Sequence, residues 1–81
     1  MNYVLVILSG GIISEVYFYA GISRAIQSLS EYVKAMNPEK DDAGVYCPEG
    51  MIANAKDFLD DNDEFVDNYK EVMRRHYERR D

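Results

Sequence analysis

Two short apolar runs separated by glycines open the chain. Residues 3–8 and residues 12–19 are rich in β-branched and aromatic side chains. Both runs are too short for a typical helix and are typical of strands. Gly10 and Gly11 lie between them and supply the positive φ angles that a tight hairpin turn needs. The pattern therefore predicts an antiparallel β-hairpin at the N-terminal end of the sequence.

The predicted hairpin carries apolar side chains on both faces. A two-residue loop predicts three opposed pairs: Leu8 with Ile13, Val6 with Glu15, and Val4 with Tyr17. The other face, with Leu5, Ile7, Val16 and Phe18, is the expected core face. A hairpin with two apolar faces and two open edges is not stable alone. We therefore expect it to form a homodimer, by its edge or by its second face, through these residues: Val4, Val6, Leu8, Ile13, Glu15, Tyr17 and Tyr19.

The rest of the chain shows the periodicity of amphipathic helices. Residues 22–36 carry one apolar stripe at steps of three and four, made of Ile22, Ile26, Leu29, Val33 and Met36. Residues 51–59 and 63–79 are predicted as two further helices. The short apolar segment 44–47 is either a minor third strand or a plug over the core. We expect one α+β domain over residues 1–81, in which an N-terminal hairpin packs against three helices.

Composition and charge narrow the class of protein. A chain of 81 residues suits one domain with a thin core. The N-terminal apolar run is broken by Ser9 and Gly10 and carries Glu15, which predicts neither a signal peptide nor a membrane span. A single cysteine, Cys47, cannot form an internal disulfide, and a cytoplasmic location is expected.

The acidic residues concentrate in the middle of the sequence. The net charge is −6, and residues 39–68 hold ten acids and two bases, a local charge of −8. This balance disfavours direct binding to nucleic acid or to an anionic membrane. It favours a protein partner with a basic surface. The basic C-terminal end is interpreted as a solubilising helix terminus, with Arg74, Arg75, Arg79 and Arg80.

No motif indicates catalysis, a cofactor or a metal. Five residues match ligand positions of an EF-hand loop: Asp60, Asn62, Glu64, Asn68 and Glu71. The match fails at Phe65, where the calcium loop needs a glycine, and helix capping by Asp61 or Asn62 accounts for the same acidic stretch. Cys47 and His76 are too few for a zinc site, and no third group is evident to orient them as a nucleophile pair. We expect a protein that is not an enzyme.

Two functional interpretations follow. In the first, a row of carboxylates imitates phosphates and occupies the basic groove of a partner such as a nucleic-acid-binding protein. The carboxylates of this row belong to Asp57, Asp60, Asp61, Asp63, Glu64 and Asp67. In size and charge the chain is similar to small phage-borne inhibitors of host nucleic-acid machinery, anti-CRISPR proteins among them, without a shared motif. In the second, the chain is a structural or regulatory homodimer assembled through the hairpin.

Overall fold

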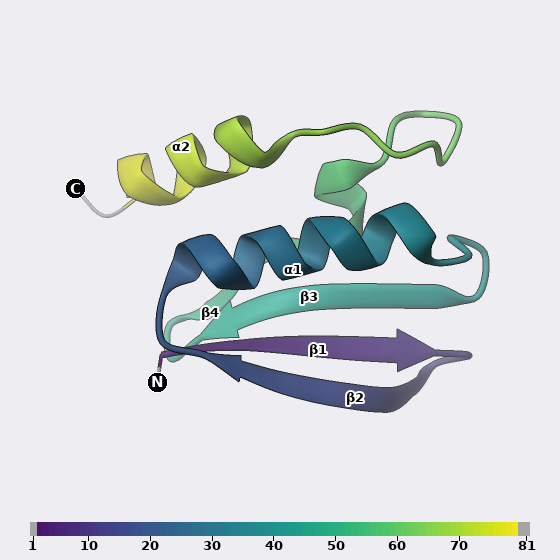
Figure 1. Ribbon diagram of the computed structural model, residues 1–81, viewed down its shortest axis with the longest axis horizontal. Helices are drawn as coiled ribbons and strands as arrows, with labels where there is room; N and C mark the ends of the chain where they lie inside the picture. The colour runs from purple at the N-terminus through teal and green to yellow at the C-terminus, as the bar shows by residue number, and fades with distance from the viewer. Residues whose placement is uncertain (1, 80–81) are drawn as a thin grey trace.

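The computed structural model describes residues 2–79, with side chains to residue 77. A four-stranded antiparallel sheet, in the order β2-β1-β3-β4, carries all the helical elements on one side (Figure 1). The elements in chain order are β1 (Tyr3–Ser9), β2 (Ile12–Tyr19), α1 (Ile22–Ala35), β3 (Asp41–Cys47), β4 (Gly50–Asn54), a 3₁₀ turn η1 (Ala55–Phe58) and α2 (Tyr69–Arg79).

The predicted N-terminal hairpin is confirmed by the pairing of β1 with β2. Gly10 and Gly11 have φ angles of 60° and 82°, the left-handed values expected for a tight two-residue turn. The segment 44–47 is part of a full strand, β3, which pairs with the other edge of β1. Because β1 is paired on both sides, the hairpin has only one open edge, that of β2.

The prediction of three helices packed on a hairpin is wrong. Residues 51–59, predicted as a helix, form β4 and the short turn η1 instead. Gly50 has a φ angle of 129° and lies in the turn that reverses the chain onto β3. Ile52 is an extra residue in the pairing with β3, so Met51 and Ala53 lie on opposite faces, Met51 exposed and Ala53 buried.

The predicted helix 63–79 is shorter than expected and begins at Tyr69. Residues 59–68 form a loop in which Leu59 and Phe65 make an isolated antiparallel bridge. Asp63 has a φ angle of 60°, and the amide of Val66 donates to the carbonyl of Phe58 at 2.9 Å. These contacts hold the segment in a turn, so its polar residues do not start the helix.

The core lies between the sheet and α1. Four residues of the predicted stripe, Ile22, Ile26, Leu29 and Val33, are buried in α1, as is Ala25. The fifth, Met36, follows the last residue of the helix and is partly buried. They join a cluster that includes Val45 of β3, Phe58 of η1 and Val72 of α2. The hydroxyls of Ser23 and Tyr69 lie 2.7 Å apart and connect α1 to α2. No helix in the described part of the chain is long and apolar enough to cross a membrane.

Candidate functional site

The side of the sheet opposite α1 is apolar and has no element packed on it in the described chain. We call this surface the open face and define it by the side chains, and one glycine, that strand pairing places there: Val4, Val6, Leu8, Ile13, Val16, Phe18, Gly44, Tyr46 and Met51. Within the strands, Asp42 is the one charged residue on this side, and it lies near the start of β3, at one end of the sheet. Asn54, the last residue of β4, is paired with Gly44 and is the other polar residue on this side.

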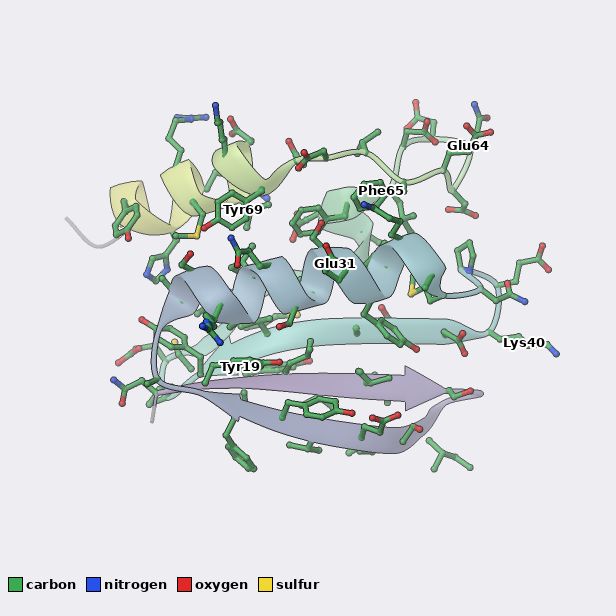
Figure 2. All side chains as sticks on the ribbon, in the orientation of Figure 1. Tyr19, Glu31, Lys40, Glu64, Phe65 and Tyr69 are labelled. Carbon is green, nitrogen blue, oxygen red and sulfur yellow. The ribbon has the colours of Figure 1, made fainter. Side chains whose placement is uncertain are left out.

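Large apolar side chains on the open face are strongly exposed. Phe18 is 64% exposed, Ile13 61% and Met51 46%. Figure 2 shows side chains of β2 projecting away from the helices, with no other part of the chain beyond them. A contiguous exposed apolar patch on a small protein marks an interaction site more often than a single exposed apolar residue does.

A β-bulge in β2 decides which side chains reach the open face. Ile7 pairs with Glu15, whereas Leu8 pairs with Ile13, so Ser14 is an extra residue. The predicted register of Val6 with Glu15 and Val4 with Tyr17 is therefore wrong. The observed pairs are Val6 with Val16 and Val4 with Phe18. Val16 and Phe18, expected in the core, lie on the open face, and the sequence offers no clear signal for the bulge.

Glu15, Tyr17 and Tyr19, expected on the second face, lie on the helix side of the sheet instead. Tyr19 packs against the core cluster, and the hydroxyl of Tyr17 donates to the carboxylate of Glu15. Burial raises the pKa of the Tyr32 phenol on α1, and the carboxylates of Asp41, Glu15 and Asp42 raise it further. These three β2 residues therefore do not contribute to the open face.

Gly44 lies in the middle of the open face and is covered by a neighbouring ring. A Cβ at this position would lie 3.1 Å from Cε1 of Tyr46, because the Tyr46 ring lies over the glycine. Gly44 is therefore buried beneath the ring, while Tyr46 itself is 37% exposed. The most exposed side chains of the open face belong to β2, where Phe18 is 64% and Ile13 61% exposed.

Both edges of the sheet are interrupted. The bulge at Ser14 lies in β2, and a second irregularity leaves Ile52 of β4 as an extra residue between Met51 and Ala53. Bulges break the regular row of backbone donors and acceptors that another strand would need for pairing. The edges are thus less suited to association than the open face.

The acidic residues divide into two groups with different tasks. Asp57 accepts a hydrogen bond from the Asn54 amide at 2.9 Å, in a capping box at η1, and pairs with Arg75 at 2.8 Å. Asp60 accepts from the amides of Asn62 and Glu64 at 2.8 and 3.0 Å. These carboxylates stabilise local structure inside the chain.

The remaining acids of the predicted partner-binding set lie in the loop that precedes α2. Asp61, Asp63 and Glu64 are exposed. Asp67 is also exposed, and its carboxylate lies 3.5 Å from the Tyr69 amide at the start of α2. The sequence suggested Asp61 or Asn62 as the cap of the last helix, but that helix starts at Tyr69, beside Asp67. Asn54 and Asp57 cap η1, and Asp60 bonds to amides of the loop.

The five residues at EF-hand positions serve other contacts. Asn68 donates to the carbonyl of Asp57 at 3.0 Å, and Glu71 pairs with Arg74 within α2 at 2.5 Å. The hydrogen bond from Arg74 lowers the pKa of Glu71. In the residues whose side chains are described, no three His, Cys, Asp or Glu groups are placed to hold a metal ion.

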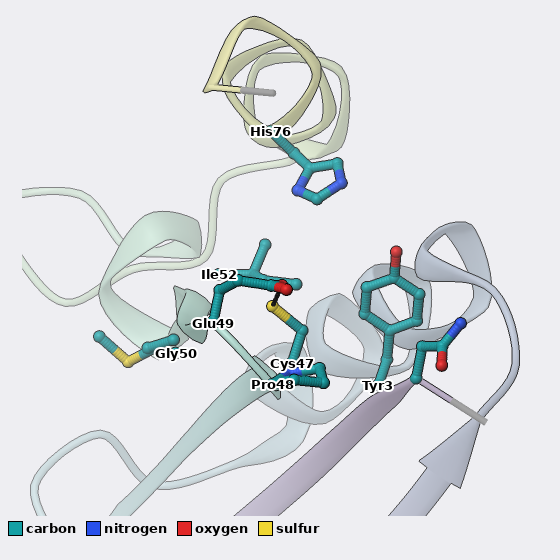
Figure 3. A pocket seen from close by; sticks show the side chains of 9 residues that line it. Tyr3, Cys47, Pro48, Glu49, Gly50, Ile52 and His76 are labelled. Carbon is teal, nitrogen blue, oxygen red and sulfur yellow. Dashed lines mark hydrogen bonds between the residues drawn. The ribbon is translucent and has the colours of Figure 1, made fainter. Parts of the chain in front are cut away.

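A hollow of about 490 Å³ lies between α2 and the β3–β4 turn (Figure 3). Tyr3, Cys47, Glu49, Ile52 and His76 are among the residues that line it. The Cys47 thiol donates to Oε1 of Glu49 at 3.1 Å, and the His76 ring packs edge-on against Tyr3 with 6.4 Å between centroids. The thiol is therefore bonded to a carboxylate rather than to the imidazole that would activate it as a nucleophile.

Comparison with known proteins found no matching family model, no matching curated protein and no matching solved structure. Function is therefore argued from the surfaces of this chain alone.

Proposed function

We propose that this protein is a non-catalytic protein-interaction module that binds through the open face of its sheet. The observation that supports the proposal is the exposure of apolar side chains on one continuous surface, with Phe18 at 64% and Ile13 at 61%, and with Asp42 near the end of the sheet as its one charged strand residue. The helix side of the same sheet, by contrast, holds a close-packed core that includes Leu5 and Val45.

The open face is large enough to contribute to binding. Four strands at about 4.8 Å spacing, each about seven residues long at about 3.3 Å per residue, give a flat area of roughly 440 Å². At about 25 cal/mol per Å², covering this area contributes on the order of 11 kcal/mol before the entropic cost of association. A surplus of a few kcal/mol after that cost is enough for specific binding.

Adjacent residues on β2 supply a matched pair of variants to test the proposal. Val16 is 43% exposed on the open face, and Tyr17 is 44% exposed on the other side. The Val16→Lys variant should keep its circular dichroism spectrum and lose binding to any partner, whereas Tyr17→Lys should keep both. Unchanged binding by a folded protein with both Val16→Lys and Phe18→Lys would refute the proposal.

The acidic loop is a second candidate interaction surface. The loop that contains Lys40 and the loop that contains Glu64 lie at the same end of the molecule (Figure 2). Together they carry exposed acids that include Glu39, Asp61, Asp63 and Glu64. A basic partner, such as a nucleic-acid-binding protein that the chain inhibits, would be attracted to this end.

Salt and charge reversal distinguish the second candidate from the first. Binding at the acidic end should weaken steeply as salt rises, because the charges are exposed. Reversing Asp61, Asp63 and Glu64 to lysine should abolish it, while Asp57 and Asp60 are left intact because their carboxylates accept hydrogen bonds from backbone amides. Binding that survives both treatments would exclude the acidic end.

A further inference from the structure

We propose that the occupant of the open face is a second copy of this chain, packed sheet against sheet about a two-fold axis. The inference rests on the proposed function, since it names the partner of the same surface. It is supported by the charge, strand order, area and edges of the sheet.

Charge favours a copy of the same chain over a basic partner. Within residues 3–54, Asp42 is the one charged strand residue on the open face, and it lies at the end of the sheet. The exposed acids Asp61, Asp63 and Glu64 belong to the loop before α2, on the helix side. Two open faces can therefore meet without placing like charges in contact, although the chain carries a net charge of −6. A basic partner would find one counter-charge on this surface, Asp42, and only at the end of the sheet.

The strand order suits contact of the open face with itself. In a two-fold interface the same patch serves both copies. Because β1 lies between β2 and β3, a two-fold axis along β1 places β2 of each copy over β3 of the other. Phe18 on β2 is 64% exposed and Tyr46 on β3 is 37% exposed, so both can contact the other copy across the spacing of about 10 Å that packed sheets adopt.

The area indicates a reversible dimer. Two flat faces of roughly 440 Å² bury about 900 Å² in total, and protruding side chains on β2 add to this. Stable interfaces bury about 1,200–2,000 Å², and incidental contacts mostly bury less than about 800 Å². The total of about 900 Å² lies between these two classes, so the dimer should be weak and dissociate at micromolar concentrations.

Face packing is favoured over pairing at the edges. The exposed edges belong to β2 and β4, and each contains an irregularity, at Ser14 and Ile52. Glu15 next to the first bulge adds a charge to the β2 edge. Charged residues and bulges are the features by which sheet proteins prevent edge pairing. Edge pairing would also leave the open face uncovered.

Sedimentation equilibrium over a concentration series tests the inference. The wild-type chain of 9.4 kDa should approach twice that mass as its concentration rises, and added salt should not reduce the mass. Val16→Lys with Phe18→Lys should raise the dissociation constant at least tenfold, whereas Tyr17→Lys should change it less than threefold. If lysine at these sites impairs folding, the milder pair Val16→Thr and Phe18→Ser should still weaken the dimer.

Three outcomes would overturn the second-copy inference. A dimer that persists unchanged in the folded Val16→Lys, Phe18→Lys variant would place the contact elsewhere. A wild-type monomer at several hundred micromolar, with another protein bound in a manner that requires Val16 and Phe18, would refute self-association and leave the proposed function standing. A monomer with no binding that depends on these residues would refute both.

Discussion

Replacing Asp57 by alanine should destabilise the protein although the residue belongs to an acidic surface segment. Its carboxylate accepts a hydrogen bond from the Asn54 amide at 2.9 Å and pairs with Arg75 at 2.8 Å. The Asn68 side chain bonds to its backbone carbonyl at 3.0 Å. Asp57 therefore connects β4, η1 and α2, so its loss should loosen the packing of α2.

The expected magnitude follows from the two side-chain contacts. A capping interaction is worth about 0.5–2 kcal/mol. The ion pair is partly exposed, at 45% for the Arg75 side chain and 23% for that of Asp57, and contributes about 0.2–1 kcal/mol. Asp57→Ala should therefore lower the free energy of unfolding by about 1–3 kcal/mol. An 81-residue domain is stable by about 4–12 kcal/mol in total, so the loss is readily measured.

Urea unfolding followed by circular dichroism measures this loss, at one fixed protein concentration for all variants. Arg75→Ala removes the ion pair alone and should cost less than about 1 kcal/mol. Asp61→Ala is the matched surface control and should change stability by less than about 0.5 kcal/mol, because Asp61 is exposed. Equal losses for Asp57→Ala and Asp61→Ala would show that the assignment of the caps is wrong.

Three further predictions concern the core, the pH dependence and the open face. Leu29→Ala should cost about 2–5 kcal/mol in urea unfolding, because Leu29 is fully buried, whereas Val16→Ala should cost less than about 1 kcal/mol in the monomer. Because the pKa of Tyr32 is raised in the folded state, its contribution to stability is complete below pH 10.0 and is lost as pH rises through the folded-state pKa. Tyr32→Phe should therefore reduce the loss of stability measured above pH 10.0. Gly44→Val should displace the Tyr46 ring, since the added Cβ would lie 3.1 Å from it. The variant should lower the free energy of unfolding by about 1–3 kcal/mol and alter the near-ultraviolet circular dichroism spectrum. An unchanged spectrum would contradict the packing of Tyr46 over Gly44.

The N-terminal hairpin and α1 could be predicted because local signals agree there. Gly10 and Gly11 lie between two β-branched runs, and the buried stripe of α1 follows a helical period. In these segments intrinsic propensity, turn chemistry and burial favour the same structure. Hence the two strands and the first helix were identified close to their observed bounds.

The C-terminal half was harder to predict because its short apolar segments fit the periodicity of a helix as well as that of a strand. Met51, Ile52 and Ala55 are spaced as on a helix, yet Gly50 turns the chain onto β3 and backbone pairing with that strand decides the outcome. Such pairing depends on residues that are close in space and is not encoded in a local pattern. The turn at residues 60–64 likewise prevents a helix from forming there, so α2 begins at Tyr69.

The open face could be predicted only in part. Val4, Val6, Leu8 and Ile13 were placed on the second face, and the structure agrees. The extra residue at Ser14 then places residues 15–19 of β2 on the faces opposite to those predicted, since one extra residue exchanges the two faces of a strand. Tyr46 and Met51 could join the surface only once β3 and β4 were known to extend the sheet.

Valine methyl NMR on dilution provides the most direct test of the claim that the open face binds a second copy. Val4, Val6 and Val16 lie on the open face, Val33, Val45 and Val72 lie in the core, and Val66 is 37% exposed in the loop before α2. Diluting a methyl-labelled sample from about millimolar to about micromolar concentration should shift the methyl signals of the first three valines and leave those of the other four in place. Valine methyl signals that do not change with concentration, or a shift confined to Val66, would contradict the account.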